Sequence, residues 1–91
     1  MKYFDWDEEK NKRLKEERGI GFEDIVIAID EGKLLITLDH PKKSNQKIYI
    51  VSVENYAYIV PFVEDEEKKF LKTIYPSRKM TKEYIIGKEK V

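Results

Sequence analysis

KTIYPSRKMT, residues 72–81, is the stretch on which the prediction of fold and function depends. It runs from an apolar strand pattern into a cluster of cations. Pro76 has no backbone N–H to donate to a strand ladder, so it predicts the end of a strand, and a helix is expected to begin near Thr81. Arg78 and Lys79 then follow a strand end, where a rigid sheet can aim them at a phosphodiester. The alternative is that these cations only face solvent.

The composition predicts one folded domain over residues 1–91. Charged residues make up 40% of the chain and hydrophobic residues 41%, with six Tyr and four Phe, which is too apolar for a disordered chain. The absence of cysteine excludes disulfides and thiolate metal sites, and the single histidine, His40, excludes a two-histidine ribonuclease within one chain. Because no long apolar span or secretory pattern is present, we expect a cytoplasmic protein with no membrane contact, cofactor or metal.

The net charge of zero conceals two halves of opposite sign. Residues 1–67 hold ten Lys/Arg and sixteen Asp/Glu, whereas residues 68–91 hold eight Lys/Arg and two Asp/Glu, so the halves carry −6 and +6. This asymmetry predicts a basic surface on an acidic body, as expected for contact with nucleic acid or with an acidic protein segment.

Hydrophobic periodicity and turn residues predict eight elements in the order β-α-α-β-β-β-β-α. They cover residues 3–6, 7–18, 22–29, 33–38, 47–53, 56–63, 69–75 and 81–90. The pattern indicates an α+β fold, in which two N-terminal helices pack on a mainly antiparallel sheet of four to five strands and a short helix ends the chain.

Three positions give these elements more detail. Glu54-Asn55 predicts a two-residue hairpin connection, with Asn available for a positive φ. Pro61 lies inside a strand pattern and predicts an edge strand or a bulge. In the strand 69–75, alternation places Lys72 on one face between Phe70 and Ile74.

Two stretches resemble the BrnT family of bacterial type II toxins, whose fold is like that of the RelE ribonucleases. FDWDEEK (residues 4–10) followed by RGIGFED (residues 18–24) is similar to the family pattern F-x-W-D-x-x-K … H-G-V-S-F-E-E. IYPSRKMT (residues 74–81) is similar to I-I-S-A-R-K-A-T. The chain departs from the family at Leu14, where an asparagine is common, and at Arg18, where a histidine is common.

The resemblance implies a toxin of a toxin-antitoxin system that cleaves RNA and inhibits translation. It also implies a cognate DNA-binding antitoxin as partner, in a toxin-antitoxin hetero-oligomer. The alternative is a non-catalytic RNA- or protein-binding module of the same fold, including a degenerate toxin, which the residues at Leu14 and Arg18 allow.

Metal-independent RNA cleavage needs a base, an acid and cations for the charge that builds on the phosphate. Arg78 is the first candidate for phosphate stabilisation, and Lys72 is a candidate for proton transfer if its strand neighbours desolvate it. Tyr75 is a candidate proton donor or stacking residue, and His40 is a candidate acid or base. Each candidate also has an alternative without a catalytic role. Arg78 then lies on the surface, and the ammonium group of Lys72 reaches water. Tyr75 then belongs to the core, and His40 only forms part of a turn.

Further residues are candidates for contact with the RNA backbone or bases: Lys79, Arg18, Lys82 and Tyr84. Ser77, beside Arg78, is interpreted as a helix cap and not as a catalytic nucleophile, because no second histidine is present to build a conventional triad. Asp5 with Asp7, and the acidic run 64–67, are possible carboxylate ligands for Mg²⁺, but such charge runs favour solvated loops over a metal site.

Overall fold

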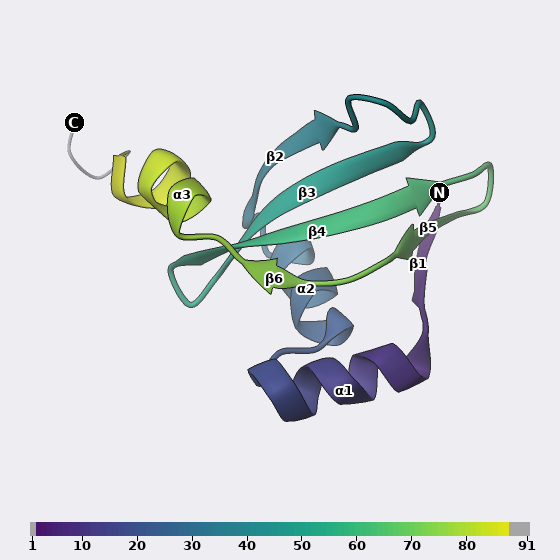
Figure 1. The fold of residues 1–91 in the computed structure, drawn as a ribbon, viewed down its shortest axis with the longest axis horizontal. Helices are drawn as coiled ribbons and strands as arrows, with labels where there is room; N and C mark the ends of the chain where they lie inside the picture. The colour runs from purple at the N-terminus through teal and green to yellow at the C-terminus, as the bar shows by residue number, and fades with distance from the viewer. Residues whose placement is uncertain (1, 88–91) are drawn as a thin grey trace.

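The computed structural model describes residues 2–87 (Figure 1). Its strands are β1 (Tyr3–Trp6), β2 (Leu34–Asp39), β3 (Gln46–Val53), β4 (Tyr56–Glu64), β5 (Lys68–Leu71) and β6 (Tyr75–Pro76). Its helices are α1 (Glu8–Arg18), α2 (Phe22–Asp30) and α3 (Arg78–Thr81), and a π-helical turn, η1 (Lys82–Ile86), continues α3. The α+β fold predicted from the sequence is confirmed.

The strands form one sheet in the order β1-β5-β4-β3-β2, with β6 also pairing with β4. The only parallel pair in the described part of the chain is β1 with β5, and the other pairs are antiparallel. The sheet has six strands where the sequence predicted four to five, because the expected strand 69–75 is divided into β5 and β6.

The first two helices have the local signals that the sequence predicted. The Asp7 carboxylate accepts hydrogen bonds from the backbone N–H of Glu9 and Lys10 at the start of α1, and Gly19 ends the helix with φ 70°. In α2, Phe22, Ile25 and Ala28 are buried.

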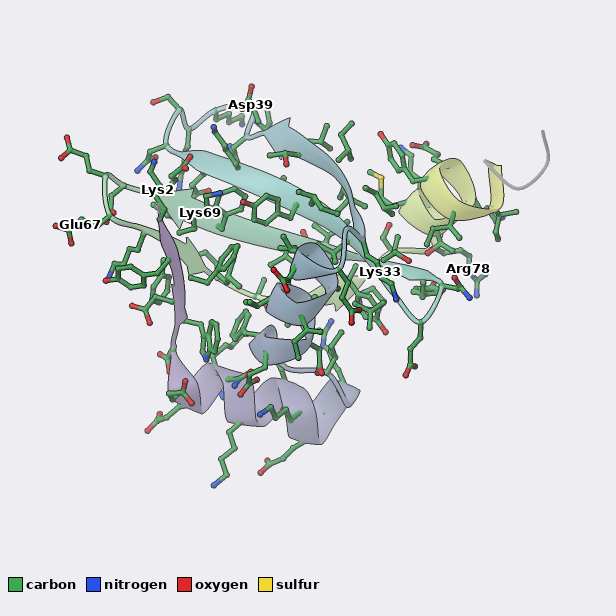
Figure 2. All side chains as sticks on the ribbon, turned by 180° about the vertical axis from the view of Figure 1, so that it is seen from behind. Lys2, Lys33, Asp39, Glu67, Lys69 and Arg78 are labelled. Atoms are coloured by element: carbon green, nitrogen blue, oxygen red, sulfur yellow. The ribbon has the colours of Figure 1, made fainter. Side chains whose placement is uncertain are left out.

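The main core lies where the helices meet the sheet, and Figure 2 shows α2 lying over one sheet face. It is formed by Leu14, Ile20, Phe22, Ile25, Ala28, Tyr49, Val51, Val60, Phe62, Leu71 and Ile74. The helices supply four of these eleven residues, Leu14 from α1 and Phe22, Ile25 and Ala28 from α2. Burying the core is the main favourable contribution to folding.

The β3–β4 hairpin turns at Glu54 and Asn55, which have φ values of 52° and 64°. Both values are positive, as a type I′ turn requires, and this turn matches the twist of the two strands. The predicted two-residue connection is therefore confirmed.

Pro61 lies in the central strand β4, so the edge-strand alternative is wrong and the bulge alternative holds. Phe62 pairs with Leu71 and Ile59 pairs with Tyr75, which leaves three residues, 72–74, opposite residues 60 and 61. The carbonyl of Pro61 accepts the backbone N–H of Lys72 at 2.8 Å. Because the nitrogen and the carbonyl of one residue point to the same neighbouring strand, the proline nitrogen also faces this irregular segment. A proline is tolerated here because β5 has ended.

The bulge overturns the predicted face of Lys72. Leu71 and Ile74 are both fully buried, although strict alternation places them on opposite faces, and Lys72 is exposed between them. An extra residue in the ladder resets the alternation of side chains. The desolvated environment expected between Phe70 and Ile74 is therefore absent.

The C-terminal helical segment begins at Arg78, three residues earlier than predicted, and not at Thr81. Its N-cap is Ser77, whose hydroxyl accepts the backbone N–H of Met80 at 3.1 Å, as the capping interpretation predicted. Residues 88–90 of the predicted helix lie outside the described residues. Among residues 2–87, no helix is long and apolar enough to cross a membrane.

Candidate nucleic-acid interface

The cations of the C-terminal segment are presented by α3 and η1. Arg78, Lys79 and Lys82 are all exposed, and none of them makes an ion pair within residues 2–87. The sequence predicted that Arg78 and Lys79 would follow the end of a strand. They do follow β6, and they form the first turn of a helix that was expected to begin only at Thr81. We call these three residues the C-terminal cations.

The segment that carries them is fastened to the sheet by Thr81. The Thr81 hydroxyl donates to the carbonyl of Ser77 at 2.7 Å and accepts the backbone N–H of Ala57 in β4 at 2.8 Å. Its side chain is only 5% exposed, so this hydrogen bond is shielded from water. A buried polar contact of this kind fixes where the C-terminal cations stand relative to β4.

Three further candidates lie around the irregular segment before β6. Lys72 is exposed within it, and Tyr75, 38% exposed, is the first residue of β6. Arg18, at the end of α1, donates from Nη1 to the carbonyl of Ile74 at 3.3 Å. The fold therefore brings Arg18 beside the segment 72–75, although 56 residues separate it from Ile74 in the sequence.

Tyr84 and His40 lie in different surroundings. Tyr84 is half-buried in η1. His40 follows β2, and Figure 2 shows its neighbour Asp39 well apart from Arg78. The Nδ1 atom of His40 accepts the backbone N–H groups of Lys42 and Lys43 at 3.1 and 3.2 Å. His40 therefore orders its own loop and does not join Arg78 in one site.

Four hollows on the described surface are lined by other residues than Arg78, Lys72 and Tyr75. One, of about 350 Å³, includes Lys2, Lys47 and Glu64. Both lysines pair with Glu64, at 2.9 and 3.5 Å, and the hydrogen bond from Lys2 is the main cause that lowers the pKa of this carboxyl. Asp65 and Glu66 also line this hollow, so its carboxylates outnumber its lysines and it is a poor anion site.

No family model, curated protein or solved structure matches this chain. The resemblance to BrnT toxins therefore stays a prediction from the sequence, as does any activity that it implies. Within residues 2–87, no group of three or more Asp, Glu or His side chains is arranged to hold a metal ion.

Sequence reasoning missed two polar residues that the fold places in specific contacts. Asn11 is 2% exposed, accepts the backbone N–H of Phe22 at 2.7 Å and donates to Glu23 at 2.9 Å. Lys69 donates to the hydroxyl of Tyr49 at 2.9 Å, with its ammonium 5.8 Å from the ring centre of Phe4. No local pattern signals either contact, because the partners come from other elements.

Proposed function

We propose that this chain is the toxin of a type II toxin-antitoxin pair and acts in the cytoplasm as a metal-independent endoribonuclease. The observation that carries the proposal is the group of C-terminal cations, which are exposed, make no ion pair within residues 2–87 and lie on a segment fastened to β4. Exposed guanidinium and ammonium groups held on a folded scaffold suit the phosphates of RNA. The likeness of residues 4–10, 18–24 and 74–81 to the BrnT patterns supports the same proposal.

In this proposal each candidate has a limited chemical task. Arg78 binds the phosphate through paired N–H donors and stabilises the charge that develops as the 2′-oxygen attacks phosphorus, while water takes the 2′-hydroxyl proton and the bond to the 5′-oxygen breaks. Lys72, Lys79 and Arg18 position the backbone as cations. Tyr75, which is exposed, stacks on a base or donates its phenolic proton to the leaving oxygen.

A second candidate function is a non-catalytic RNA-binding module. It is favoured by one observation, that the four hollows include none of Arg78, Lys72 and Tyr75. A nuclease needs these groups around one phosphate, whereas a binding module needs only cations and aromatic rings on a surface.

Expression of the chain alone, followed by analysis of total RNA, tests the proposal. A ribonuclease toxin arrests growth and shortens RNA, coexpression of the cognate antitoxin relieves the arrest, and Arg78→Ala abolishes cleavage. Lys12→Ala, which removes an exposed cation from α1, is the matched control and retains activity. RNA that is shifted on a gel but never shortened supports the binding module instead, and unchanged cleavage by Arg78→Ala and Lys72→Ala shows that their roles are wrong.

A further inference from the structure

The outer side of α2 carries an exposed apolar side chain among carboxylates. Ile27 is 55% exposed and separates two hollows of about 300 and 200 Å³, which share Ile27 and Glu31 in their linings. We call this region the α2 surface. It includes the following residues, which line the two hollows: Phe4, Asp24, Ile27, Asp30, Glu31 and Glu54. Figure 2 shows α2 in front of the sheet, with no other element covering it in that view.

The charge of the α2 surface is strongly negative. Among residues 2–87, Lys33 is the only cation that lines its two hollows, and Lys33 pairs with Glu31 at 3.7 Å. Asp30 and Glu54 make no ion pair within residues 2–87. Carboxylates at this density repel RNA, whereas a basic protein segment with an aliphatic side chain complements both the charge and the hollows.

The chain itself contains a segment with that chemistry. The segment α3–η1 presents the C-terminal cations and ends at Ile86, which is 43% exposed. Within residues 2–87 the exposed large hydrophobic residues are Tyr3, Ile27, Tyr75 and Ile86. Ile27 therefore lies among carboxylates, and Ile86 lies close to cations.

The two surfaces belong to different parts of one molecule. Figures 1 and 2 show α3 at one end of the sheet, well apart from α2. Because Thr81 fastens α3 to β4, the segment α3–η1 is not free to reach the α2 surface of its own chain. Only a second copy brings the two surfaces together.

We propose that the α3–η1 segment of one copy docks on the α2 surface of a second copy. Ile86 enters a hollow beside Ile27, and the C-terminal cations face Asp30, Glu31 and Glu54. The contact joins two different surfaces. If each copy docks its α3–η1 segment on the α2 surface of the other, a closed dimer forms, and otherwise the copies add head to tail into a chain. This inference goes beyond the proposed function, and it implies that self-association covers the cations offered to RNA.

Sedimentation of the purified full chain over a dilution series tests the docking. We expect the mean mass to rise with concentration at about 0.1 M salt and to fall to the monomer at about 1 M salt, where the screening length is only about 3 Å. Asp30→Lys/Glu31→Lys and Arg78→Glu/Lys79→Glu should each weaken association roughly tenfold or more. Lysine is also acceptable in the last turn of α2, because cations are favoured near a helix C-terminus.

The decisive measurement is a mixture of the two charge-reversed variants. Each variant alone should be monomeric, and the mixture should associate, because the reversed surfaces again have opposite charge. Glu16→Lys/Glu17→Lys, on exposed positions near the C-terminal end of α1, changes the net charge by the same amount as Asp30→Lys/Glu31→Lys and should leave association unchanged. A wild-type chain that stays monomeric, or a mixture that stays monomeric, overturns the docking. Neither result bears on the proposed ribonuclease, because no RNA is present.

Discussion

Asn11 is a buried amide that connects α1 with the start of α2. Its Oδ1 accepts the N–H of Phe22, one of the first N–H groups of α2, which have no partner within the helix. Asn11→Ala leaves this buried donor unsatisfied, and we expect a loss of about 1–3 kcal/mol in the free energy of unfolding, measured with urea. Lys12→Ala on the exposed side should change it by less than about 0.5 kcal/mol. Equal effects of the two substitutions contradict this role.

Glu23 makes stability depend on pH in the acid range. Hydrogen bonds from Asn11 and then from Lys15 lower the pKa of its carboxyl below the usual 4.5. The folded-state pKa is thus below the unfolded one, so the contribution of Glu23 is complete above pH 4.5 and is lost as the pH falls through the lowered value. The Glu23 side chain is 45% exposed, and screening by water limits the contribution to less than about 1 kcal/mol.

Glu23→Gln tests this dependence, because the glutamine carbonyl can still accept from Asn11. We expect the variant to be less stable than the wild type at neutral pH and the difference to vanish in acid. Urea unfolding at a series of pH values measures it. A difference that stays constant with pH shows that the carboxylate charge has no part in it.

Elements defined by short-range chemistry were predicted well from the sequence. Asp7 and Gly19 bound α1, and Glu54-Asn55 forms the hairpin turn, because the signal and its effect lie within a few residues. The bulge opposite Pro61 was only half anticipated, since it depends on which strand becomes the neighbour of β4. Strict alternation of side chains therefore predicted the wrong surroundings for Lys72. The proton transfer expected of a desolvated lysine was predicted from those surroundings.

The start of α3 was missed for a similar reason. Ser77 and Thr81 both have side chains that can cap a helix. The backbone N–H of Ala57 in β4 donates to the Thr81 hydroxyl, so Ser77 is the residue that caps α3. The candidate site was affected in the same way: the fold brought Arg18 beside the segment 72–75, but it left His40 in its own loop. Long-range pairing decides such cases, and local patterns do not encode it.

Thr81 gives the element-scale test. Thr81→Val keeps the shape but leaves the N–H of Ala57 without an acceptor, so we expect a loss of about 1–3 kcal/mol and faster hydrogen exchange at that amide. Thr81→Ser keeps the hydroxyl and should preserve the protection of Ala57. If Thr81→Val exchanges as slowly as Thr81→Ser, the hydroxyl does not fasten α3 to β4.

At the scale of the whole molecule, net charge cannot attract RNA, because the cations and carboxylates of the chain cancel. Attraction must come from the separation of acidic and basic surfaces on the protein. In RNA binding, the C-terminal cations face the RNA and the acidic α2 surface faces away from it. Binding should therefore weaken steeply with salt even though the net charge is zero, because each cation that contacts a phosphate releases a counterion.

The salt dependence also counts the cations that take part. For single-stranded RNA each phosphate contact adds about 0.7 to the steepness of log K against log salt concentration. Arg78→Ala/Lys79→Ala should therefore make the slope shallower by about 1.4, with weaker binding at all salt concentrations, as measured by fluorescence anisotropy with a labelled RNA of no fixed sequence. Lys10→Ala/Lys12→Ala on α1 removes the same charge and should leave the slope unchanged if the C-terminal cations form the interface. Equal slopes for all three proteins would instead place the RNA elsewhere on the surface, since counterion release depends on the cations in contact and not on total charge.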